Sequence, residues 1–149
     1  MTTSLLMLVV GSMLGNFMTI QRAAARQVSR SELTDQLRLT MDRITKDVRQ
    51  ATSVHPASSS SYLEFDTFID GSEHRVAYDG SSGTTVTRSL DGATPITLLE
   101  RLQTTAIFTY APDVTDASVI TVTLIAKPDK FEEDGSDVTL TSEVRRRNR

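Results

Sequence analysis

The pattern of apolar positions divides the chain into a helical first third and a strand-rich remainder. From about Leu5 to Ala51 the sequence has no proline and only two glycines, Gly11 and Gly15. Such a stretch predicts one long helix, which ends before Pro56. After Ala57 the spacing of apolar residues changes from the helical period to alternation, as expected for half-buried strands.

The second half of this predicted helix is amphipathic. Apolar residues follow one another at steps of three or four and share one face, namely Leu33, Leu37, Met41, Ile44 and Val48. The opposite face carries pairs of opposite charge four residues apart, namely Arg38 with Asp42, Asp42 with Lys46, and Arg43 with Asp47. We therefore expect the apolar face to pack on a sheet and the charged face to meet solvent.

The remainder reads as a series of short strands separated by turns. The predicted strands are Tyr62–Ile69, His74–Tyr78, Thr84–Leu90, Pro95–Leu99, Thr104–Tyr110, Val119–Ala126 and Val138–Arg145. Aspartate-glycine pairs at positions 70–71, 79–80 and 91–92 mark turns between the earlier strands. Short turns between successive strands predict an antiparallel meander.

The opening segment is the least charged part of the chain. The first 21 residues carry no charged side chain, and arginines follow at positions 22, 26 and 30. As a helix this segment would span roughly 31 Å, which is close to the hydrocarbon thickness of a bilayer. The side chains expected in a membrane or in the core of a filament are Leu5, Leu6, Leu8, Val9, Val10, Leu14, Phe17 and Ile20.

A cleaved signal peptide is the alternative reading of the same segment. Its apolar core would be residues 5–14, and the alanines at 23–25 would form a small-residue cleavage site. The arginines that follow argue against export, because by the positive-inside rule they would hold this end in the cytoplasm.

Composition limits the class of protein. With 149 residues, 38% of them hydrophobic, and a formal net charge of -3, the chain is expected to form one domain with an appendage. No basic patch with interleaved aromatic residues appears, so nucleic acid is not an expected partner. The lack of cysteine excludes disulfides, thiolate metal sites and a cysteine nucleophile.

Candidate catalytic or metal-binding groups are few. His55 and His74 lie far apart in the sequence without a ligand pattern around them. The acidic loop from Lys127 to Asp137 contains carboxylates that suit calcium, but their spacing is not that of an EF-hand, so we expect a solvated turn. Neither G-x-S-x-G nor S-x-x-K occurs. The sequence therefore predicts no enzyme, no cofactor and no metal site.

Two further segments of the sequence can be compared with those of a known family. The helix continues from Gln21 to Val54 as QRAAARQVSRSELTDQLRLTMDRITKDVRQATSV, and the chain ends in SEVRRRNR. With the Met1-Thr2 start, the apolar helix and the strand-rich remainder, these segments resemble bacterial type IV pilin-like proteins. The similarity covers essentially the whole chain and is nearest to minor pilins or minor pseudopilins of the J type, PilW-like or PulJ-like. The family has a basic leader and usually Glu at the fifth mature position, whereas this sequence shows no leader before Met1 and has Leu5.

The resemblance implies a fold class and a division of the chain. The fold would be α+β, with a long N-terminal helix, apolar in its first half and amphipathic in its second, packed on an antiparallel β-sheet in a pilin-like arrangement. Residues 1–25 would form a membrane or filament-core helix, residues 26–55 an amphipathic helix that continues into the globular domain, and residues 56–149 the sheet domain.

The resemblance also implies a structural function. The chain would be a minor subunit of a type IV pilus or a type II secretion pseudopilus, and its partners would be other pilin or pseudopilin subunits. Before assembly it would be a single-pass protein of the bacterial inner membrane, with its C-terminal domain outside the cytoplasm. Afterwards it would belong to a cell-surface or periplasmic filament. The alternative is a secreted or membrane-anchored cell-surface binding module with a cleaved signal peptide and a mature N terminus near Arg26.

Overall fold

The computed structural model describes residues 2–128 and 137–146, and in the first helix it describes side chains continuously from Gln27 onward. Before Gln27 it describes only four, those of Met18, Ile20, Gln21 and Ala24. The elements within these residues are α1 (Thr2–Arg49), β1 (Ala51–Val54), β2 (Tyr62–Ile69), β3 (Ser72–Asp79), β4 (Thr85–Leu90), β5 (Ile96–Glu100), β6 (Phe108–Ala111), β7 (Val119–Ala126) and β8 (Val138–Arg145). A helix is thus followed by strands alone.

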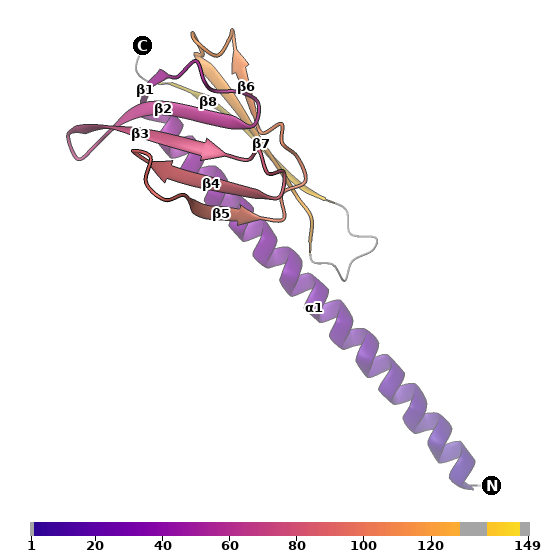
Figure 1. The fold of residues 1–149 in the computed structure, drawn as a ribbon. Helices are drawn as coiled ribbons and strands as arrows, with labels where there is room; N and C mark the ends of the chain where they lie inside the picture. The colour runs from indigo at the N-terminus through magenta and orange to yellow at the C-terminus, as the bar shows by residue number, and fades with distance from the viewer. Residues whose placement is uncertain (1, 129–136, 147–149) are drawn as a thin grey trace.

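The strands form two antiparallel sheets, which Figure 1 shows meeting around the C-terminal part of α1. The five-stranded sheet has the order β1-β2-β3-β4-β5 and the three-stranded sheet the order β6-β7-β8, so within each sheet every strand pairs with its neighbours in the chain. The turn between β2 and β3 uses Asp70 and Gly71 at φ 52° and 83°, the left-handed region that these residues tolerate.

One hydrophobic core joins α1 to both sheets. It contains Leu37 and Ile44 of α1, Phe65 and Tyr78 of the five-stranded sheet, and Ile120 and Leu124 of the three-stranded sheet. The rings of Phe65 and Tyr78 stack with their centroids 6.2 Å apart. Along β7 every second residue is buried, which is the pattern of a strand with one face on the core.

The expected fold class, a long N-terminal helix packed on one antiparallel sheet in a pilin-like arrangement, is wrong. The strands divide into two sheets, and the described helical side chains are buried only from Leu33 to Val48. The division occurs between β5 and β6, where the amides of Ile107 and Phe108 both donate to the carbonyl of Ser60. This segment turns away from β5, so the later strands form a second layer.

The expectation that the first half of the helix spans a membrane is also wrong. Within the described residues, no helix is long and apolar enough to cross a membrane. The described part of α1 after Ile20 soon includes polar and charged side chains, among them Gln21, Gln27 and Arg30. The single-pass membrane interpretation therefore has no support from the structure.

Several element boundaries differ from the expected ones, and the largest differences are at two places. The helix ends at Arg49, and the short strand β1 occupies residues that were expected to continue it. The predicted strand from Thr104 to Tyr110 is represented only by β6, from Phe108 to Ala111. In β2 the ring of Phe68 faces away from the core and is 56% exposed.

Candidate functional site

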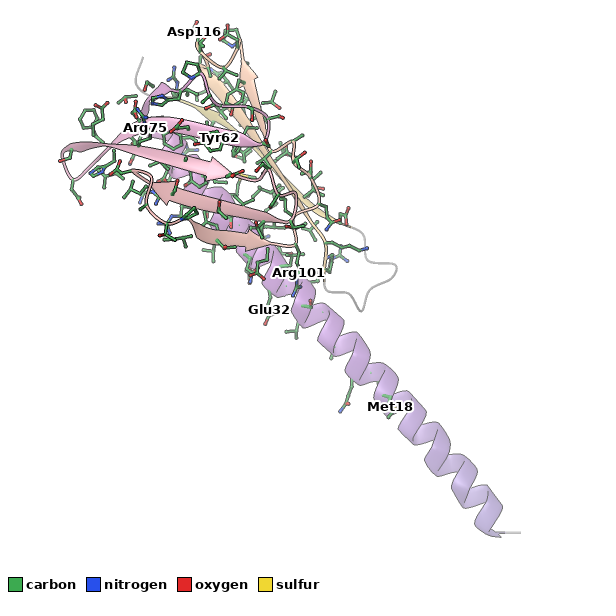
Figure 2. All side chains as sticks on the ribbon, in the orientation of Figure 1. Met18, Glu32, Tyr62, Arg75, Arg101 and Asp116 are labelled. Carbon is green, nitrogen blue, oxygen red and sulfur yellow. The ribbon has the colours of Figure 1, made fainter. Side chains whose placement is uncertain are left out.

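The long helix has a part that the sheets do not cover. We call residues 2–32 of α1 the shaft, and the remainder of the described structure the head. Figure 1 shows the shaft extending far from the head, with the N terminus at its distant end. In Figure 2 Glu32 lies where α1 meets the head, and Met18 lies well beyond that point. None of the side chains described on the shaft is buried.

Apolar side chains are among the exposed residues of the shaft. Met18 is 60% exposed, Ile20 66% and Val28 58%. Of the residues predicted for a membrane or filament core, only Ile20 has a described side chain. The side chains of Leu5, Leu6, Leu8, Val9, Val10, Leu14 and Phe17 lie outside the described residues. The shaft therefore offers apolar surface that the head of the same chain leaves uncovered.

The residues predicted to pack on a sheet lie in the core of the head. Leu37, Ile44 and Val48 are fully buried, and Leu33 and Met41 are 3% and 7% exposed. α1 contacts β5, β7 and β8, so this stripe is covered by strands of both sheets. Thr40 adds a hydrogen bond between the helix and the five-stranded sheet, because its hydroxyl donates to the carbonyl of Leu98 in β5 at 3.2 Å. These contacts fix the angle at which the shaft leaves the head.

A polar network lies beside this stripe, at the last turns of α1. Asp47 Oδ2 accepts a hydrogen bond from the Tyr78 hydroxyl at 2.7 Å and from Arg88 Nε at 3.0 Å. The side chains of Arg88 and Asp47 are 11% and 18% exposed. The expected solvent-facing pairing of Asp47 with Arg43 is therefore wrong, because Asp47 faces β3 and β4.

The electrostatics of this network favour one protonation state. Burial raises the pKa of the Tyr78 hydroxyl far above its usual value, and the charge of Asp47 raises it further. Burial by itself would lower the pKa of Arg88, but Asp47 and Tyr78 together more than offset it and raise the pKa. Tyr78 therefore remains a neutral donor and Arg88 a cation, both directed at one carboxylate. Sequence reasoning missed this site because its members come from three separate elements.

Each histidine has a carboxylate partner that the sequence spacing did not reveal. His55 Nε2 lies 2.8 Å from Asp66 Oδ2, and His74 Nδ1 lies 2.7 Å from Asp91 Oδ2. Asp66, His74 and Asp91 line an open groove at one end of the five-stranded sheet, and His55 is next to it through its contact with Asp66. Among the described residues, no group of three or more His, Asp or Glu side chains is arranged to hold a metal ion. The loop from Lys127 to Asp137, expected to be a solvated turn, has residues 129–136 outside the described part of the chain.

The geometry contains polar networks that connect elements and a helix that leaves apolar surface exposed. The described residues show hydrogen-bonded ion pairs that join one element to another. No protein-family model matches this chain, and comparisons with curated proteins and with solved structures find no significant match.

Proposed function

We propose that this chain is a structural subunit of a filament and that it assembles by packing α1 against helices of other subunits. The observation that carries the proposal is the shaft, because it extends beyond the head and exposes Met18, Ile20 and Val28. Exposed apolar side chains on a helix are stabilised when helices of other subunits cover them. The proposal assigns the chain no reaction.

The finer proposal is a minor subunit of a type IV pilus or a type II secretion pseudopilus. It rests on the sequence from Gln21 to Val54 and the arginine-rich ending, which resemble that family. The partners would be other pilin or pseudopilin subunits, and the head would lie outside the cytoplasm. The proposal rests neither on the two-sheet head nor on a membrane-spanning segment.

Single cysteines test the assembly proposal, because the chain has none of its own. Met18→Cys places a thiol on the shaft, and Ile96→Cys places one on a head residue of similar exposure, 63% against 60%. In the cells that produce the protein, we expect an added thiol-reactive cross-linker to join Met18→Cys to other subunits and to leave Ile96→Cys as a monomer. Equal cross-linking of both variants, or none of Met18→Cys, would contradict the proposal.

The N terminus of the mature protein separates the proposal from a cleaved binding module. Intact-mass measurement should find the shaft retained. A mature terminus near Arg26, with the product released as single subunits, would instead favour the cell-surface binding module. In that case the head alone would carry the function.

A further inference from the structure

Arg75 connects several strands at the outer end of the five-stranded sheet. Its guanidinium Nε lies 3.3 Å from Asp66 Oδ1 on β2. Its backbone N–H donates to Asp91 Oδ1 at 2.8 Å, and its carbonyl accepts from the backbone N–H of Asp91 at 2.7 Å. Asp91 follows β4, so one residue of β3 is joined to both neighbouring strands. Figure 2 shows Arg75 in this part of the head.

Histidines complete the contacts on each side of Arg75. Asp66 Oδ2 accepts from Ser53 at 2.9 Å and lies 2.8 Å from His55 Nε2, which connects it to β1 and the residue that follows. Asp91 Oδ2 lies 2.7 Å from His74 Nδ1. A continuous chain of polar contacts therefore crosses the sheet from β1 to the β4–β5 turn. We call the residues His55, Asp66, His74, Arg75 and Asp91 the clasp.

Apolar packing contributes little at the same end of the sheet. Beyond the buried pair of Phe65 and Val76, the hairpin formed by β2 and β3 extends outward in Figure 1. Near its tip Phe68 is 56% exposed and Ile69 is only partly buried. Regions with few buried apolar contacts are the first to open locally. The polar contacts of the clasp thus add to the backbone hydrogen bonds between β2 and β3 that hold this end closed.

Other charged groups also face the clasp. Glu64 Oε1 lies 3.9 Å from Arg75 Nε, and Glu73 lines the same groove. From the end of β8, Arg146 reaches the carbonyl of Thr52 in β1 at 3.5 Å. The carboxylates of the clasp therefore lie beside Arg75 and the two imidazoles, with two further carboxylates in the same groove.

We propose that the clasp is an acid-sensitive latch. With Asp66 and Asp91 ionised, it holds the β2–β3 hairpin against β1 and the β4–β5 turn. With both protonated, it releases this end of the hairpin while the rest of the head stays folded. Protonation removes the negative charges that hold the side chains of His55, His74 and Arg75 in place.

The direction of the pH dependence follows from the carboxylates. Burial would raise the pKa of Asp66, but hydrogen bonds from Ser53, His55 and Arg75 hold it below its ordinary value. The hydrogen bond from His74 and the backbone N–H of Arg75 lower the pKa of Asp91. Folded-state values below the unfolded ones mean that the clasp is at full strength above the ordinary value of about 3.9 and weakens as the pH falls through the folded values.

The double variant Asp66→Asn/Asp91→Asn imitates the protonated clasp at neutral pH in the full chain. We expect amide hydrogen exchange in residues 68–75 to accelerate by about tenfold or more, as for a local opening, while exchange in β7 is unchanged. Asp113→Asn is the matched control, because hydrogen bonds from its own loop also lower the pKa of Asp113 but it lies outside the clasp. This control should leave exchange in the hairpin as in the wild type.

Acidification of the wild type provides the second arm of the experiment. After correction for intrinsic exchange rates, hairpin exchange should increase as the pH falls below about 4, and the double variant should lack this increase. Unchanged hairpin exchange in the double variant at pH 7 would overturn the latch. Equal acceleration in the hairpin and in β7, or failure of the double variant to fold, would show that these aspartates stabilise the whole head and would also overturn it.

Discussion

Asp47 is the residue on which we expect the stability of the junction between α1 and β4 to depend most. It accepts hydrogen bonds from Tyr78 and from Arg88, whose side chain is only 11% exposed. Asp47→Ala would leave a mostly buried cation without its partner. Because both groups retain some contact with solvent, we expect a loss of about 2–4 kcal/mol in the free energy of unfolding, at or below the usual cost of breaking a buried pair. Urea unfolding at pH 7 measures this loss.

Arg43→Ala is the control at residue scale. Arg43 lies on the exposed side of α1, so its removal should change the free energy of unfolding by less than about 0.5 kcal/mol. Losses of similar size for Asp47→Ala and Arg43→Ala would contradict the buried network. The sequence could not predict this difference, because spacing within a helix paired the two residues, whereas the true partner of Asp47 lies 41 positions away.

At the scale of elements, α1 provides a matched pair of substitutions two positions apart. Met41 is 7% exposed and lies in the core, whereas Leu39 is 71% exposed. Met41→Asp would bury an unpaired charge and should cost several kcal/mol, on the order of 3–5. Leu39→Asp should cost within about 0.5 kcal/mol, since its side chain stays in water. Thermal unfolding of the two variants tests which face of α1 the sheets cover, and equal losses would refute the assignment.

The pattern of apolar residues and turn signals predicted the bounds of some elements correctly and those of others poorly. The predicted strands Tyr62–Ile69, Val119–Ala126 and Val138–Arg145 are confirmed with the same bounds, because each combines strand-forming residues with clear turn signals. β1 was missed because only one residue separates it from the helix. The separation into two sheets was missed because it depends on where the backbone of Ile107 and Phe108 finds its acceptor, Ser60, far away in sequence.

At the scale of the whole molecule, the head and the shaft differ in the contacts that stabilise them. The head is held by its own core and by the polar contacts of Asp47 and Thr40, so its stability is a property of one chain. The shaft has no described buried side chain, so the head does not cover its described apolar residues. The sequence indicated this division through the apolar stripe from Leu33 to Val48. It did not locate the histidine-aspartate contacts, whose partners come from separate strands.

Two isoleucines of nearly equal exposure test this division between assembly and folding. Ile20 on the shaft is 66% exposed, and Ile96 on β5 is 63% exposed, so a charge at either position should leave the folded head intact. If α1 packs against other helices, Ile20→Glu places a carboxylate in an apolar contact and should weaken association by about tenfold or more. Ile96→Glu should have little effect on association. The measurement is the fraction of protein that sediments as large assemblies from the cells that produce it, with thermal unfolding of each purified variant as the check on folding. Loss of assembly by Ile96→Glu alone would move the subunit contact from the shaft to the edge of the five-stranded sheet.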